Sequence, residues 1–337
     1  MKVTEMNSQK ENHEITATLD NVYANGKIMG LSGGLYKILL SNTEEKITVY
    51  CRAKGAFRHN GLSPLVGDKV KVRCDRPLSE LATLGKSDGG IVIEEILDRK
   101  SALIRPPLAN LDCMFVTMAA ASPAPILPTV DKLIAIAEHN SIKSCVVIGK
   151  CELDERRADE ICDIYKKSGF DTFKISCVQN IGIDALREYI ESELIGKTAA
   201  FAGASGVGKS TLMNKLFPTL SLETGSISQK IERGRHTTRC VDIYEAEMSD
   251  GIVYIADTPG FSMLDFQHFD FFSKDDLPYT FKEFVPYIGS CRYTKCSHTK
   301  EEGCAILEAI KNGEIPQSRH ESFLEIYSIL KNKKEWS

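Results

Sequence analysis

Hydrophobic and polar residues alternate in short runs over the first part of the chain. Between residues 15 and 97 these runs include Tyr36–Leu40, Lys46–Tyr50 and Lys69–Arg73, and turns that contain Gly or Pro separate them. A period of two is typical of strands with one buried face. About five short strands in about 80 residues suit a small barrel of the OB type. We therefore expect an all-β domain over residues 15–97.

From residue 98 the pattern changes to apolar strands that alternate with amphipathic helices. Expected strands are Leu111–Ala120, Ser144–Ile148, Thr172–Ser176, Thr198–Ala202 and Ile252–Ala256, and expected helices are Thr129–Asn140, Asp154–Ser168, Ile183–Leu194 and Thr211–Leu216. This alternation predicts a parallel sheet that is covered on both faces, here an α/β domain over residues 98–261. Residues 99–110, which contain Arg105-Pro-Pro-Leu, are interpreted as a linker.

The two ends of the chain have different compositions. Residues 1–14 are polar and mixed in charge, lack the apolar core of a signal peptide and are expected to be a disordered tail. Residues 262–337 contain aromatic and acidic residues, then cysteines, then a helical tail, and predict a third, mostly helical domain. The sequence shows no membrane signal, and we expect a cytoplasmic monomer. The formal charge of −4 gives no global attraction to nucleic acid.

The segment Gly203–Ser210 reads Gly-Ala-Ser-Gly-Val-Gly-Lys-Ser and matches the phosphate-binding P-loop in full. It follows an expected strand and opens an expected helix, so backbone N–H groups and the helix N-terminus can both face phosphates. Lys209 would reach the β- and γ-phosphates, and the Ser210 hydroxyl would bind Mg²⁺. The expected nucleotide-binding residues here are Gly203, Ala204, Ser205, Gly206, Val207, Gly208, Lys209, Ser210 and Thr211.

Two segments downstream of the P-loop match the γ-phosphate side of such a site. Asp257 ends a strand and can hold Mg²⁺ through water, and Gly260 can offer its N–H to the γ-phosphate. In the polar segment Arg233–Arg239, either Thr237 or Thr238 could complete the Mg²⁺ shell when the loop is ordered.

The residue that would align the attacking water is the least defined part of this site. Many GTPases place a Gln directly after the Asp-x-x-Gly turn, but here that position is Phe261. His236 is the nearest alternative, and we name it with Lys209 as a catalytic candidate. The other interpretation of His236 is contact with RNA or solvent.

A base-reading motif stands upstream of the P-loop rather than downstream. The strand that ends at Ile148 leads into Gly149-Lys-Cys-Glu152, and the next strand leads into Ser176-Cys177. These segments correspond to the Asn-Lys-x-Asp turn and the short Ser-Ala loop of GTPases, but in a different chain order. A circular permutation explains this order, because the sheet stays the same while the chain enters it at another loop.

The C-terminal cysteines and the barrel carry two further expectations. Cys291, Cys296, His298 and Cys304 fall within fourteen residues, and Cys₃His is a recognised structural zinc set. Between Lys46 and Lys86 there are nine Lys and Arg against three Asp and Glu, which suits a phosphate backbone. Tyr50 and Phe57 could stack on bases or belong to the barrel core.

The order of these features resembles the circularly permuted ribosome small-subunit-dependent GTPase family of bacteria, over about residues 15–330. The stretches that carry the resemblance are Ile93-Glu-Glu-Ile, Arg99-Lys-Ser-Ala-Leu, Gly203–Thr211, Gly234-Arg-His-Thr-Thr, Asp257-Thr-Pro-Gly-Phe and the cysteine cluster. The resemblance implies an OB-fold, a permuted GTPase domain and a zinc-binding domain. It also implies Mg²⁺-dependent GTP hydrolysis that the small ribosomal subunit stimulates, late maturation of that subunit, and rRNA binding through the two outer domains.

The base motif departs from this family. Where the family has Asn-Lys-x-Asp, this chain has Gly149-Lys150-Cys151-Glu152, so one amide is missing and the acid is longer. A bidentate base contact contributes about 1–3 kcal/mol, so guanine preference could fall about ten-fold or more. Two alternatives stay open: a P-loop ATPase with relaxed base specificity, and a nucleotide-gated RNA-binding module.

Overall fold

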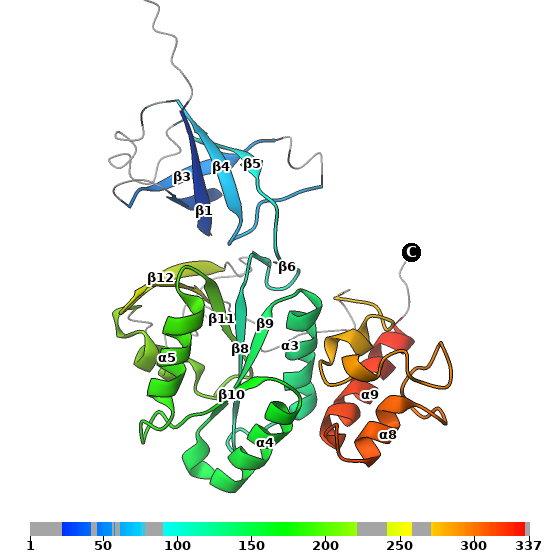
Figure 1. Ribbon diagram of the computed structural model, residues 1–337. Helices are drawn as coiled ribbons and strands as arrows, with labels where there is room; N and C mark the ends of the chain where they lie inside the picture. Colours follow the sequence, from blue (N-terminus) through cyan, green and yellow to red (C-terminus); the bar gives the residue numbers. More distant parts are fainter. Residues whose placement is uncertain are drawn as a thin grey trace, which may run out of the picture.

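The computed structural model describes residues 22–41, 46–55, 57, 61–75, 77, 90–220, 241–257 and 271–333 (Figure 1). It shows a β-barrel, an α/β domain and a helical C-terminal region, and this arrangement confirms the predicted fold class. The expected tail of residues 1–14 lies outside the described residues. No helix among the described residues is long and apolar enough to span a bilayer.

Five strands form the N-terminal barrel: β1 (Val22–Ser32), β2 (Leu35–Leu40), β3 (Thr48–Ala53), β4 (Lys69–Cys74) and β5 (Val92–Ile96). Their order around the barrel is β1-β2-β3-β5-β4, and a parallel pairing of β3 with β5 closes it. The alternating pattern of β4 explains its place, because Val70 and Val72 are fully buried while the exposed Lys69 stands on the outer side.

The segment interpreted as a linker is packed against the barrel. Its strands β6 (Ala102–Leu103) and β7 (Leu108–Ala109) form a two-stranded ribbon. Arg99 donates from Nε and Nη2 to the carboxylate of the fully buried Asp68, at 2.7 and 2.8 Å. Asn110 Nδ2 donates to Gly67 O at 3.0 Å. These partners lie 31 and 43 positions apart in sequence, so the local pattern could not show that the segment is anchored.

The central sheet has six strands in the order β10-β9-β8-β11-β13-β12. Their bounds are β8 (Cys113–Ala119), β9 (Lys143–Gly149), β10 (Asp171–Lys174), β11 (Thr198–Ala202), β12 (Asp242–Met248) and β13 (Gly251–Asp257). All neighbours are parallel except β12, which pairs antiparallel with β13. The chain first builds one half of the sheet from β8 outward to β10, and then returns to β11, which is the strand order expected for the permuted domain.

Helices cover both faces of this sheet (Figure 1). Helices α3 (Leu127–His139) and α4 (Glu155–Lys167) pack on the face that carries Met114 and Val146, and α5 (Ile183–Leu194) and α6 (Lys209–Leu216) pack on the face that carries Phe115 and Val147. Consecutive strand residues therefore enter opposite cores, which is why these strands are apolar throughout.

The C-terminal region consists of short 3-10 turns, η3 (Leu277–Thr280) and η4 (Val285–Tyr287), and two helices, α8 (Ala305–Lys311) and α9 (Gln317–Asn332). It lies beside α3 (Figure 1). The fully buried Arg319 on α9 reaches the carboxylate of Asp131 on α3 and also pairs with Glu283 Oε1 at 2.5 Å. Tyr165 of α4 donates its hydroxyl to the same Asp131 at 2.9 Å.

Candidate functional site

The P-loop lies between β11 and α6, at the carboxyl edge of the sheet. Gly203, Gly206 and Gly208 have φ values of 142°, 78° and 102°, which favour glycine. A Cβ atom at Gly203 would overlap with Thr117 O of the neighbouring β8. Helix α6 begins at Lys209, two residues before the expected start at Thr211. The glycines therefore let the loop turn tightly against the sheet.

Lys209 is held within the loop that precedes it. Its ammonium group donates to the carbonyl oxygens of Gly203 at 2.8 Å and Ala204 at 2.7 Å. Burial lowers the pKa of this ammonium group. Ser210 and Thr211, which follow in the first turn of α6, are exposed. A cation and exposed hydroxyl groups are thus gathered at one helix N-terminus, where an anion is favoured.

The base motif contacts the P-loop directly. Lys150 has a left-handed φ of 55°, and its ammonium group donates to Gly206 O and to Ser122 O, both at 2.7 Å. A Cβ atom at Gly149 would lie 3.2 Å from Val207 O. Segments that are more than fifty residues apart in sequence thus meet at one edge of the sheet, as expected if both serve one nucleotide.

Glu152 offers a buried acceptor in this region. It lies in the 3-10 turn η1 (Cys151–Leu153), and its Oε2 atom is buried without a hydrogen-bond partner among the described residues. The second predicted loop is next to it: Cys151 N donates to Ile175 O at 3.1 Å, and Ser176 is fully buried. Burial raises the pKa of the Cys177 thiol, and the Glu152 carboxylate adds to that rise. An unpaired buried acceptor favours a ligand that brings N–H donors.

Asp257 lies at the carboxyl end of β13, beside the P-loop strand. It pairs in register with Asp242, the first residue of β12. Burial raises the pKa of the Asp257 carboxyl, and the facing Asp242 raises it further. The other predicted residues of the γ-phosphate side, His236, Thr237, Thr238 and Gly260, lie outside the described residues.

The predicted metal ligands form a compact cluster. The ligand atoms of Cys291, Cys296, His298 and Cys304 all lie within 4.8 Å of one another. His298 Nδ1 is 3.6 Å from Cys291 Sγ and 3.5 Å from Cys304 Sγ. Ligands of a tetrahedral zinc ion, at about 2.0–2.3 Å from the metal, stand about 3.5–3.8 Å apart. The soft donor set and its spacing therefore fit zinc.

Comparisons with known proteins agree with this geometry. A family model described as RsgA GTPase matches residues 96–267, and one described as RsgA N-terminal domain matches residues 25–77. The small ribosomal subunit biogenesis GTPase RsgA of Ruminiclostridium cellulolyticum is 38% identical over 315 residues, which cover 91% of this chain and 94% of the relative. The chain belongs to the RsgA GTPase family. The predicted resemblance is therefore confirmed.

Other members of the RsgA family match over similar lengths. RsgA of Clostridium beijerinckii is 38% identical over 314 residues, which cover 92% of this chain and 99% of that protein. The crystal structure of YjeQ from Thermotoga maritima aligns with a TM-score of 0.74 at 29% identity, over 93% of this chain and 100% of the other. The structure of YloQ, a circularly permuted GTPase, aligns with a TM-score of 0.69 at 29% identity, over 98% and 100%.

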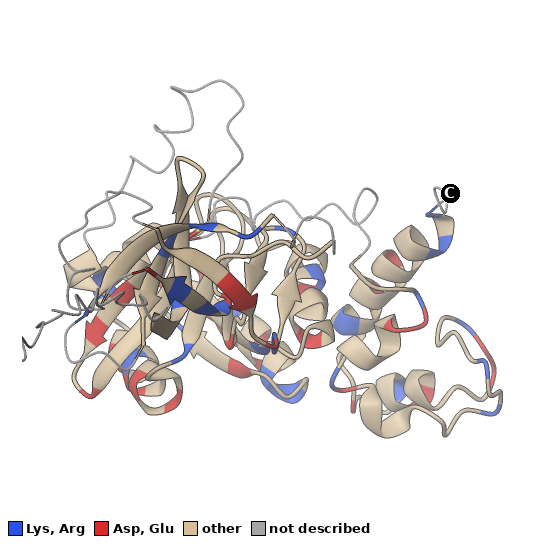
Figure 2. Ribbon diagram, turned by 90° about the horizontal axis from the view of Figure 1, so that it is seen from above, with Lys and Arg blue, Asp and Glu red and all other residues tan. Residues whose placement is uncertain are grey.

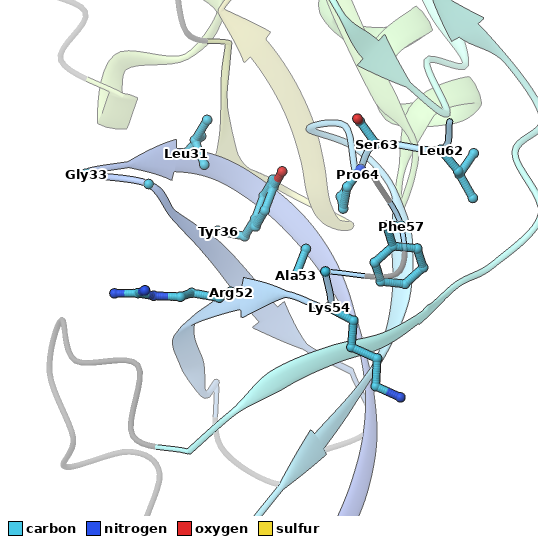
Figure 3. Close-up of a pocket in the computed structure, with 12 residues that line it drawn as sticks. Leu31, Gly33, Tyr36, Arg52, Ala53, Lys54, Phe57, Leu62, Ser63 and Pro64 are labelled. Atoms are coloured by element: carbon cyan, nitrogen blue, oxygen red, sulfur yellow. The ribbon is translucent and has the colours of Figure 1, made fainter. Parts of the chain in front are cut away.

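The barrel of this RsgA-family chain has a cavity of about 580 Å³ at one end. Tyr36 and Phe57 line it together with Leu31, Leu62 and the basic residues Arg52 and Lys54 (Figure 3). No acidic residue is among the described residues that line it. Elsewhere on the described ribbon, basic and acidic residues are interspersed (Figure 2). The cavity thus combines aromatic surface with two basic residues, of which Lys54 pairs with Glu94 of β5.

Several residues that the structure brings to these sites carry no local signal in the sequence. Ser122 contributes only a backbone carbonyl, which leaves no signal in the residue type. Tyr36 stands in an ordinary alternating strand, so its place in the cavity depends on the barrel closing. Strand β12 (Asp242–Met248) was not expected, and its buried residues Ile243 and Ala246 lie three positions apart, so it lacks the period of two that is typical of a strand. The local pattern therefore gave no signal for Asp242.

Proposed function

We propose that this chain binds GTP with Mg²⁺ at the P-loop and hydrolyses it in a cycle coupled to late maturation of the small ribosomal subunit, in the cytoplasm. The observation that carries this proposal is the contact of Lys150 with Gly206, because it joins a base-reading turn to a phosphate-binding loop. The names of the RsgA relatives, which describe small-subunit biogenesis GTPases, supply the biological setting.

On the phosphate side, Lys209 would exchange its two bonds to loop carbonyls for bonds to the β- and γ-phosphates. Ser210 and Asp257 offer a hydroxyl and a carboxylate, and such hard oxygen donors suit Mg²⁺. When bound, Mg²⁺ would neutralise the charge that develops on the phosphate oxygens. Thr237 or Thr238 is proposed to add a further oxygen, and Gly260 to donate its N–H to the γ-phosphate.

Hydrolysis needs an aligned water molecule, and Phe261 cannot supply a polar group for it. We propose His236 for this role, since it is the nearest polar candidate in the segment between the P-loop and Asp257. The His236→Ala variant should lose the turnover that small subunits stimulate and keep GTP binding. Unchanged stimulated turnover would exclude His236 from catalysis.

On the base side, Glu152 would accept hydrogen bonds from the N1–H and N2–H groups of guanine. Adenine carries an acceptor where guanine has N1–H, so it would leave the buried Oε2 atom unpaired. A buried unsatisfied acceptor costs about 1–3 kcal/mol, which supports GTP over ATP. Ser176 and Cys177 are proposed to support the base from the neighbouring loop.

The barrel and the C-terminal region are proposed to contact rRNA. In the barrel cavity an unpaired base could stack on Tyr36 or Phe57, with Arg52 near the backbone phosphate. Stacking contributes about 1–3 kcal/mol per base, so the Tyr36→Leu variant should bind a single-stranded oligonucleotide about 5- to 150-fold more weakly. The Tyr23→Leu variant, which removes an exposed aromatic ring outside the cavity, is the matched control in an anisotropy titration.

Zinc is proposed to hold the C-terminal region through Cys291, Cys296, His298 and Cys304. Four protein ligands leave no open position, so the metal would stabilise structure rather than react. The fit of the sulfur and nitrogen spacing to a tetrahedron supports zinc.

The departure at Gly149–Glu152 favours one second candidate, a P-loop ATPase with relaxed base specificity. Turnover of GTP and of ATP should therefore be measured with and without small ribosomal subunits. The proposed function predicts preference for GTP and acceleration by the subunits. Equal use of both nucleotides would favour the ATPase, and turnover that the subunits do not change would favour a nucleotide-gated RNA-binding module.

A further inference from the structure

Two carboxylates face each other where the sheet meets the barrel. Asp242 and Asp257 are directly paired in register on the antiparallel strands β12 and β13. Directly opposite residues stand about 4.5–5.5 Å apart at their Cα atoms and place their side chains on the same face of the sheet. Like charges in this position destabilise a sheet, and a bound cation would offset the repulsion between the two carboxylates.

The barrel determines where the Asp242 carboxylate can lie. Strand β1 has an irregular register between Ile28 and Gly30, and a Cβ atom at Gly30 would overlap with Asp242 Oδ1. The absence of a side chain at Gly30 therefore leaves the space that this carboxylate occupies. Burial raises the pKa of Asp242, and the Lys37 ammonium on β2 opposes that rise. Asp242 thus contacts the barrel at Gly30 and faces Asp257 within its own sheet.

We propose that Asp242 is a positioning residue for Asp257, and that the barrel sets its position through Gly30 and Lys37. The inference rests on the proposed function, in which Asp257 holds Mg²⁺ through water. A second negative charge directly opposite Asp257 strengthens the field that attracts the divalent cation. A shift of the barrel against the sheet moves this charge and so changes how tightly the Mg²⁺-nucleotide complex is held.

Other contacts keep the two domains together around this point. Lys27 donates to Thr198 Oγ1 at 2.5 Å and lies 4.0 Å above the centre of the Tyr254 ring. Lys46 pairs with Glu245 of β12 at 3.3 Å. The Gly30→Ala variant should therefore displace the flexible Asp242 carboxylate without separating the barrel from the sheet.

The test measures the Mg²⁺ concentration that half-saturates tight binding of fluorescent GDP, a readout that does not depend on turnover. Asp242→Asn and Gly30→Ala should each raise this concentration about ten-fold, the lower end of the effect of outer partners of a metal ligand. Lys46→Gln, which removes a neighbouring contact between the same domains, should leave it unchanged. Thermal unfolding of each variant checks that the fold is kept.

A double variant separates positioning from general damage. In an Asp242→Ala background there is no carboxylate for Gly30→Ala to displace, so the second substitution should add no further change. An equal effect of Gly30→Ala with and without Asp242, or no effect of either single variant, would overturn the inference. Asp257→Asn tests the proposed function separately: if it leaves the Mg²⁺ requirement unchanged, the proposed role of Asp257 fails as well.

Discussion

The buried carboxylate of Glu152 leads to a sharp prediction about base specificity. Glu152→Gln is nearly isosteric, but it replaces one carboxylate oxygen with an NH₂ group. The Oε2 atom is buried and has no partner among the described residues, so guanine N–H groups would be its first donors. The substituted amide would set donor against donor at one of these positions, and the fold should be unaffected because no internal bond is lost there.

The expected size of the effect follows from the cost of an unsatisfied buried group. At about 1–3 kcal/mol, GTP should bind about 5- to 150-fold more weakly to Glu152→Gln. Xanthosine triphosphate, which has a carbonyl where guanine has its amino group, should bind more tightly to this variant than to the parent chain.

Competition against fluorescent GDP measures both affinities. Glu155→Gln is the matched control, because Glu155 lies three residues later and its side chain is 81% exposed. Equal GTP affinity in the Glu152→Gln variant and the parent chain would refute the assignment of Glu152 to the guanine edge. It would also give the relaxed-specificity alternative its strongest support.

Three further predictions concern other parts of the chain. Lys150→Met removes charged hydrogen bonds to two carbonyls, each of which contributes about 1.5–3 kcal/mol. Nucleotide affinity, measured by fluorescence titration, should therefore fall at least ten-fold. An unchanged affinity would contradict the bridging role of Lys150. Cys304→Ser should abolish stoichiometric zinc in metal analysis and make the C-terminal region sensitive to protease, because metal binding in such sites contributes about 10–16 kcal/mol to folding. If the variant retained zinc and protease resistance, this site would not be the zinc site. Burial lowers the pKa of Lys27 from 10.5 to about 8, so between these values the unfolded chain binds a proton that the folded chain lacks, and stability should rise with pH. In thermal unfolding, Lys27→Met should lose that rise relative to the parent chain, and parallel pH profiles of the two proteins would show the lysine to be unperturbed.

The features that could be predicted from the sequence are those whose chemistry depends on residues close together along the chain. Gly203–Ser210 needs its glycines and its lysine at fixed spacing, and the cysteine cluster gathers its ligands within fourteen residues. The expected strands and helices of the central domain also follow local periodicity. These features were enough to predict the fold class and the family.

The features that could not be predicted depend on distant partners. Arg99 is held by Asp68, and Arg319 by Asp131 across 188 positions, and neither residue type indicates its partner in advance. Asp242 acquires its significance only when β12 pairs with β13 and also meets the barrel. A charge in a partly exposed strand looks the same in sequence whether it faces water or another carboxylate.

The guanidinium group of Arg319 ties the movement of helix α9 to that of helix α3. It lies between Asp131 of α3 and Glu283 of the C-terminal region, and all three side chains are almost completely buried. Removing one partner from a buried ion pair costs about 3–5 kcal/mol, so sliding α9 along α3 would be strongly opposed. The Cys₃His cluster and α3 should therefore move as one rigid body. Because α3 follows the loop whose Ser122 carbonyl accepts from Lys150, and Lys150 also donates to Gly206, this body is attached to the residue that joins the base side of the nucleotide site to the phosphate side.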